Sequence, residues 1–188
     1  GLTETLEWIR LYPIDYRYRP KEQQFHKYQW IEVQLESNSK SKDKRKESRR
    51  PNLESIRVLG EPLSVKNNWE ERRRIIDAVP HFTLNQLKAL HESERASLGV
   101  VRPKRVIDFE IREADPEWKP DWQTLFSQMT LFGPPQKPLR KMPYSFHYIF
   151  ECEDSDKPHT AMCEDWELGV LFLNESARLG SDEAAAES

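Results

Sequence analysis

The stretch from Met142 to Leu173 constrains the fold most, because a strand pattern, a polar loop and a helix pattern follow one another there. Aromatic and apolar residues recur at every second position, a period that predicts a strand with one apolar face: Tyr144, Phe146, Tyr148, Phe150 and Cys152. A polar loop over 151–158 follows, and helical spacing of apolar residues predicts a helix from Thr160. Both cysteines of the chain lie in this stretch with several carboxylates, so catalytic or metal-binding residues are most expected there.

The composition predicts a single domain over residues 1–188 with solvated insertions, because 37% of the residues are hydrophobic and 32% are charged. The net charge of −3 gives no overall field that would attract nucleic acid or anionic lipid, so such attraction requires local patches. No segment has the run of roughly 18 apolar residues of a membrane helix, and with only two cysteines we expect a reduced, cytoplasmic location. The chain starts without methionine, so we expect it to continue beyond both ends.

Alternating apolar residues predict further strands, and helical spacing predicts an inserted helix pair over 68–95, whose second helix opens with the capping-box pattern Thr83-x-x-Gln86. The strands are expected over 6–12, 28–36, 53–60 and 105–113, and residues 98–103 are expected to return the chain from the helix pair to the last of these strands. No strand-helix-strand alternation and no glycine-rich phosphate loop is present. The sequence therefore predicts an α+β fold: a small, mostly antiparallel, partly closed β-barrel with inserted helices.

Two segments are expected to connect these elements without forming part of the core. Residues 37–51, SNSKSKDKRKESRRP, are basic and contain no apolar side chain, so their burial cannot offset the entropy lost on ordering. We expect them to form a mobile basic loop. Residues 133–138 are rich in proline and are expected to form a stiff linker.

Several phrases of the sequence resemble an uncharacterised family of bacterial proteins with no established activity. They are EWIRLYPIDYR (7–17), QFHKYQWIEV (24–33), ESIRVLGE (54–61), SLGVVRPK (97–104) and the H-x5-DWE pattern (159–167). The resemblance spans nearly the whole chain and implies a common fold, without implying a chemistry. It also implies a second cysteine or similar ligand in the loop before His159, where this chain reads CEDSDKPH and has Asp154 and Asp156. That departure counts against a metal site.

One candidate site is a metal site built from Cys152, His159 and Cys163. Thiolate and imidazole are the ligands that zinc prefers, and a carboxylate would be the fourth ligand, from Asp154, Asp156 or Asp165. The spacing C-x6-H-x3-C matches no standard zinc finger. Packing is the simpler interpretation of both cysteines, because each continues an apolar face.

A second candidate is acid–base or metal-assisted hydrolysis by His159, Asp165 and Glu167. On a helix, Asp165 and Glu167 would point about 200° apart, so they would not converge on one ion. The simpler interpretation is that Trp166 is a buried anchor and that the acids around it lie in the first helical turn, where the helix dipole favours negative charge.

The third candidate is a nucleic-acid-binding surface of alternating cations and rings. The residues expected to contact phosphates or bases are Arg17, Arg19, Lys21, Lys27, Trp30, Arg45, Arg49, Arg102 and Lys104. A solvated or protein-contacting surface is the alternative, because acids outnumber cations in the whole chain.

The leading hypothesis from the sequence is a non-enzymatic, nucleic-acid-binding module that acts with a protein partner in a larger complex. The alternatives are a metal-dependent hydrolase or nuclease centred on His159, Asp165 and Glu167, and a subunit that contacts only protein. No cofactor is expected, and the ions that would suit the candidate ligands are zinc and magnesium.

Overall fold

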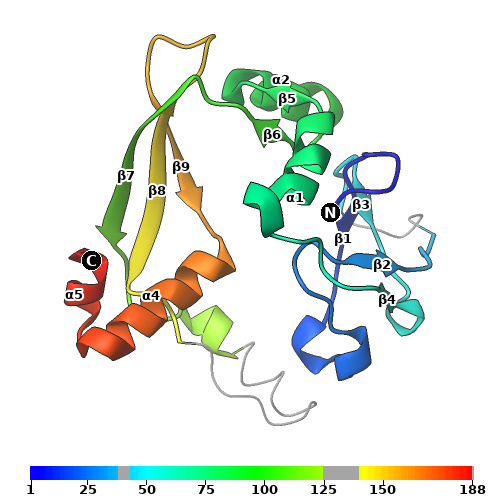
Figure 1. Ribbon diagram of the computed structural model, residues 1–188, viewed down its shortest axis with the longest axis horizontal. Helices are drawn as coiled ribbons and strands as arrows, with labels where there is room; N and C mark the ends of the chain where they lie inside the picture. Colours follow the sequence, from blue (N-terminus) through cyan, green and yellow to red (C-terminus); the bar gives the residue numbers. More distant parts are fainter. Residues whose placement is uncertain (38–42, 125–139, 188) are drawn as a thin grey trace. The chain divides into compact units, whose positions relative to one another are not determined.

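The computed structural model of the protein describes residues 1–37, 43–124 and 140–187 (Figure 1). The chain divides into two compact units, residues 1–102 and residues 103–188, where the sequence analysis expects one domain. Each unit is described by itself. The predicted proline linker over 133–138 lies outside the described residues. No helix in the described part of the chain has both the length and the apolar character needed to cross a membrane.

The described residues of the first unit form three separate two-stranded sheets, each made of strands of two or three residues. In the first sheet β1 (Arg10–Leu11) pairs in parallel with β3 (Ser48–Arg49). In the second, β2 (Trp30–Glu32) pairs antiparallel with β4 (Arg57–Leu59). In the third, β5 (His81–Phe82) pairs in parallel with β6 (Val100–Val101).

Helices and short 3-10 turns connect these strands. The 3-10 turns are η1 (Tyr16–Tyr18), η2 (Lys21–Gln23) and η4 (Leu53–Ser55), and the helices are α1 (Lys66–Ala78) and α2 (Leu84–Glu94). The predicted capping box at the start of α2 is confirmed, because Thr83 accepts a hydrogen bond from the Gln86 backbone and Gln86 accepts one from the Thr83 backbone. The capping box could be predicted from the sequence because Thr83 and Gln86 lie within one turn of the helix.

The predicted partly closed β-barrel is wrong. The described residues form four small separate sheets, and none of them closes on itself. Alternation of apolar residues shows which face of a strand is buried, but it does not show which other strand lies beside it. In the first unit, the strands of two or three residues also offer too few hydrogen bonds to close a ring of neighbours. The structure is therefore a mixed α+β arrangement.

The described part of the predicted mobile loop, residues 43–51, is packed into the first unit, and residues 38–42 lie outside the described residues. Glu47 and Ser48 are buried, and Ser48 and Arg49 form strand β3. Glu47 accepts hydrogen bonds from the backbone N–H of Ser97 at 2.9 Å and from the Ser97 hydroxyl. Burial by itself raises the pKa of Glu47, but the hydrogen bonds from Ser97, together with a hydrogen bond from its own backbone and the charge of Arg45, leave the pKa lowered. Composition did not reveal this packing because the partner lies far along the chain.

The second unit is built on one antiparallel sheet of three strands. β7 (Arg105–Glu113) pairs with β8 (Tyr144–Glu151), and β8 pairs with β9 (His159–Cys163), so β8 is central. The helices α4 (Trp166–Leu179) and α5 (Asp182–Glu187) follow β9 (Figure 1). The core lies where α4 and α5 meet the sheet, and Phe146, Phe172 and Ala185 form it. The Phe172 ring lies 5.9 Å from the Phe146 ring, centroid to centroid.

The sequence prediction of a helix from Thr160 is wrong, because residues 159–163 form strand β9. The helix starts at Trp166 and is capped by Asp165, whose carboxylate accepts a hydrogen bond of 2.8 Å from the Glu167 backbone. Trp166 is 71% exposed, so it is not the buried anchor that the sequence suggested. Phe172 occupies that role. Pairing with β8 overrides the local helical spacing, because each residue of β9 lies opposite a residue of β8.

Replacing Glu47 with alanine is expected to lower the free energy of unfolding by about 2 kcal/mol, because a buried carboxylate that accepts two hydrogen bonds is lost and Ser97 is left without them. Urea denaturation followed by tryptophan fluorescence measures the change. Glu92→Ala, at an exposed position on α2, is the control and should change stability by less than about 0.5 kcal/mol. Equal stability of the two variants would show that residues 43–51 do not anchor to the unit through Glu47.

Candidate metal centre

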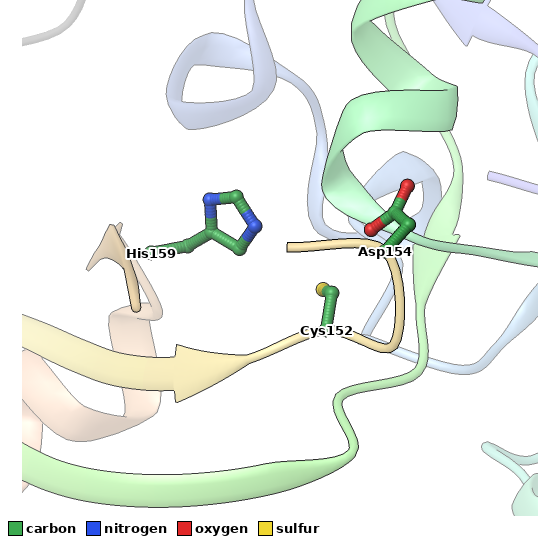
Figure 2. Close-up of side chains that lie close together, drawn as sticks. All are labelled: Cys152, Asp154 and His159. Atoms are coloured by element: carbon green, nitrogen blue, oxygen red, sulfur yellow. The ribbon is translucent and has the colours of Figure 1, made fainter. Parts of the chain in front are cut away.

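The hairpin between β8 and β9 brings Cys152, Asp154 and His159 together (Figure 2). Cys152 follows the last residue of β8, His159 is the first residue of β9, and Asp154 lies in the loop between them. Antiparallel pairing places Phe150 opposite His159, so the chain leaves and re-enters the sheet at the same end. One possible ligand atom from each of the three side chains lies within 4.8 Å of the other two.

The cluster has a buried side and an exposed side. Cys152 is 2% exposed, His159 is half-buried and Asp154 is exposed. The Nε2 atom of His159 is buried and has no hydrogen-bond partner among the described residues. Figure 2 shows the ring nitrogen farther from the backbone turned toward Cys152 and Asp154. A buried imidazole nitrogen without a partner is costly, by about 1–3 kcal/mol, unless a ligand satisfies it.

The three donors match the ligand preferences of zinc. Zinc binds thiolate sulfur at about 2.3 Å and imidazole nitrogen or carboxylate oxygen at about 2.0–2.2 Å, which places tetrahedral ligands roughly 3.5 Å apart. The donor atoms here lie within 4.8 Å of one another. Shifts on the order of 1 Å would therefore complete the geometry, and a hairpin loop can move that far. The thiolate disfavours magnesium and calcium, which take oxygen ligands.

The charges beside the cluster are already paired with one another. Arg105 donates a hydrogen bond of 2.9 Å to Glu151, and this bond lowers the pKa of the Glu151 carboxyl. Lys104 Nζ lies 3.7 Å from a carboxylate oxygen of Glu153. The acids on either side of Cys152 therefore pair with cations of the β7 end, and Asp154 is the acid that joins the cluster. The Phe150 ring, 5.7 Å from the His159 ring, packs against the imidazole.

The structure brings together two of the three predicted metal ligands. Cys163 lies at the other end of β9 from His159, about 13 Å away for four extended residues, and packs against the core of Phe146 and Phe172. The packing interpretation therefore fits Cys163, while Cys152 joins the cluster. Among the three acids considered as the fourth ligand, Asp154 is the one in place. If residues 150–160 had been interpreted as a β-hairpin, Cys152 and His159 would have been predicted at neighbouring strand ends. The expectation of a helix from Thr160 prevented that prediction.

His159, Asp165 and Glu167, the predicted hydrolytic residues, are not assembled into one site. His159 begins β9, whereas Asp165 lies beyond its last residue, Cys163. The Asp165 carboxylate caps α4 by accepting the hydrogen bond from the Glu167 backbone. The acids therefore serve the start of the helix, as the simpler interpretation expected for that segment.

The predicted nucleic-acid-binding residues differ in their exposure and in their contacts. Arg17, Lys21 and Lys27 are exposed around η1 and η2, and Trp30 is half-buried in β2. Arg19 has a side chain only 8% exposed, and it donates hydrogen bonds to the Leu53 carbonyl at 3.0 Å and to Glu54 at 3.1 Å. Arg19 therefore has a structural role.

The remaining four predicted cations make contacts within their own unit. Arg45 Nε lies 3.8 Å from Asp43, and Arg49 donates to the carbonyls of Lys46 and Ser48. Arg102 pairs with Asp77 at 3.3 Å, and Lys104 pairs with Glu153. These ion pairs reduce the positive potential that the sequence suggested.

The fold and the cluster define an α+β protein with a candidate metal-binding hairpin. Within that class, the chain belongs to the family described as Domain of unknown function (DUF8757), whose family model matches residues 80–188, more than half of the chain. Residues 1–78 match a second family model, described as Domain of unknown function (DUF8758). These matches confirm the resemblance to an uncharacterised family. No curated protein and no solved structure matches the chain.

The boundary between the two family matches differs from the boundary between the two compact units. The matches meet around residue 79, whereas the units divide after Arg102. The segment 80–102, which carries β5, α2 and β6, therefore belongs to the DUF8757 match by sequence and to the first unit by contacts. The hydrogen bonds from Ser97 to Glu47 are among the contacts that join it to that unit. The metal-centre candidate lies inside both the DUF8757 match and the second unit.

Proposed function

We propose that the protein binds one zinc-type ion through Cys152, Asp154 and His159 and that the bound ion supports metal-dependent hydrolysis. The observation that carries the proposal is the convergence of a thiol, a carboxylate and a buried imidazole nitrogen without a hydrogen-bond partner in the described chain. Convergence of acidic groups alone is common on protein surfaces. A buried thiol and an unsatisfied imidazole nitrogen beside one carboxylate are not explained by solvation.

The number of donors supports a reactive ion over a purely structural one. Structural zinc sites are closed by four protein ligands, whereas catalytic sites use three and keep one position for water or substrate. The described residues supply three donors, and Asp154 is exposed, so the cluster has an open side. A zinc ion held by Cys152, Asp154 and His159 would supply a Lewis acid that activates water near neutral pH. Phe150 and the buried Cys152 would exclude water from the other side.

The metal proposal predicts about one zinc per chain after purification and dialysis, and a strong loss of zinc in His159→Ala and Cys152→Ala. Losing one of three ligands should weaken zinc affinity by roughly 100-fold or more. Elemental analysis measures the zinc content, and the near-ultraviolet band of a cobalt–thiolate bond reports whether Cys152 is a ligand. Cys163→Ala is the matched control, because Cys163 packs against the core and should leave zinc content unchanged. Equal zinc in the Cys152 and Cys163 variants would contradict the assignment.

The hydrolytic part of the proposal is tested with the zinc-loaded full chain. Nitrophenyl esters, nitrophenyl phosphates and labelled DNA and RNA are offered as substrates with and without a chelator. We expect hydrolysis of at least one class that the chelator abolishes and that added zinc restores. Asp154→Asn should reduce this activity, and Asp156→Asn, in the same loop but outside the cluster, should not. Full zinc occupancy without hydrolysis would leave a metal site and refute the catalytic role.

Nucleic-acid binding is the second candidate function, and the exposed loop that contains η1 and η2 favours it. Tyr12 and Tyr16 are among the exposed large side chains, and Arg17, Lys21 and Lys27 are exposed along the same stretch. Exposed rings can stack on bases while cations contact phosphates. This candidate concerns the first unit and is independent of the metal centre.

Neutralising Arg17, Lys21 and Lys27 together should weaken binding to single-stranded oligonucleotides and make it less sensitive to salt. Each lost phosphate contact lowers the slope of log affinity against log salt by about 0.7, so we expect a change of about 2. Fluorescence anisotropy at several salt concentrations measures both quantities. Arg19→Ala is the control: it should destabilise the unit, because Arg19 holds Leu53 and Glu54, and should leave the salt slope unchanged in the folded protein. An unchanged slope in the triple variant would remove this surface from consideration.

A further inference from the structure

Strand β7 is an edge strand with an exposed apolar surface. It is nine residues long, and among the described residues it pairs only with β8. Val106, Ile107, Phe109 and Ile111 are between 36% and 54% exposed. A long edge strand with exposed apolar side chains is a template for pairing with another strand, and proteins normally protect such edges.

The protection on β7 covers only its first half. The pairing with β8 is irregular between Val106 and Asp108, which twists that part of the edge. The Asp108 carboxylate accepts a hydrogen bond of 2.8 Å from the Phe109 backbone. From Asp108 to Glu113 the register with β8 is regular, and a second strand pairing at Phe109 would replace the hydrogen bond that the Phe109 N–H gives to the Asp108 carboxylate. This half of the edge is suited to backbone pairing.

The charges of β7 complement those of an antiparallel copy of the same strand. If two copies pair about Glu110, Asp108 of each copy lies opposite Arg112 of the other. Two-fold symmetry makes this ion pair twice. The two Glu110 side chains would lie directly opposite each other at the centre, and the Arg112 of each chain, whose Nε donates to its own Glu110 at 2.8 Å, offsets this like-charge contact. Opposite charges directly across a strand pair stabilise the pairing.

The apolar side chains complement one another in the same register. Phe109 of each copy lies opposite Ile111 of the other, on the face that also carries Tyr148 and Phe146 of β8. The Phe109 ring lies 5.0 Å from the Tyr148 ring, so the apolar surface of β8 continues to the edge. Pairing two copies would place Phe109 of each copy beside Ile111 of the other and so reduce the exposure of both.

We propose that two copies of the chain associate through β7, antiparallel and centred on Glu110, into one six-stranded sheet. A second copy is the partner that this edge specifies, because the strand supplies both members of each ion pair and both members of each apolar pair. The interface is isologous and therefore closes as a dimer instead of growing into a fibre. The proposal is independent of the metal centre, since Cys152, Asp154 and His159 belong to the β8–β9 hairpin.

Charge reversal in the full chain tests both the partner and the register. The wild-type chain should sediment as a dimer in analytical ultracentrifugation over a series of protein concentrations. Asp108→Arg and Arg112→Asp should each favour the monomer, because every ion pair becomes a like-charge pair. The double variant should restore the dimer, since it recreates both pairs and keeps an arginine two residues from Glu110. Arg73→Asp, on α1 and outside the strand, is the control and should leave the dimer unchanged.

Circular dichroism and thermal unfolding establish that each variant is folded. The double variant also addresses this point, because a dimer regained on combining two disruptive changes cannot come from misfolding. A monomeric wild type at all concentrations would overturn the proposal. So would a single reversal that keeps the dimer, or a folded double variant that stays monomeric.

Discussion

The antiparallel pairing of β8 with β9 is the interaction on which the second unit depends. Its register places Phe150 opposite His159 at one end of the sheet and Phe146 opposite Cys163 at the other. The first pair aligns the ends of the hairpin so that Cys152 and His159 meet across the loop. The second pair sets Phe146 against Phe172 of α4. One register therefore positions both the candidate metal centre and the core.

The two ends of the three-stranded sheet differ in structure: one packs against α4 and α5, and the other carries the candidate metal centre. The end near α4 is closed by aromatic packing and by Asp182, which accepts hydrogen bonds from Ser176 and Arg140, and these bonds lower its pKa. The ionised Asp182 carboxylate therefore helps to hold α5 beside α4. At the hairpin end the Phe150 ring packs against His159, and the polar groups of Cys152, Asp154 and His159 converge. A rigid sheet with one packed end and one open end is a common way to hold a site.

Sequence patterns predicted the elements whose signals are local. The alternation over 105–113 and 144–151 became β7 and β8, and Thr83 with Gln86 formed the expected capping box. The helical spacing from Thr160 misled, because its first four residues, 160–163, pair with β8. The charge-rich composition of segment 37–51 did not indicate that Glu47 is buried against Ser97, a residue that no local pattern connects to it. In both cases a partner outside the local window determined the conformation.

The candidate site shows the same division between local and long-range information. By itself, the sequence determined that a thiol, an imidazole and several carboxylates occur within a dozen residues, and that a strand precedes them. Only the tertiary structure decided that Asp154 joins Cys152 and His159, that Cys163 packs into the core and that Asp165 caps a helix. The physical reason is that spacing along a chain limits which side chains can meet, whereas strand register and burial select those that do.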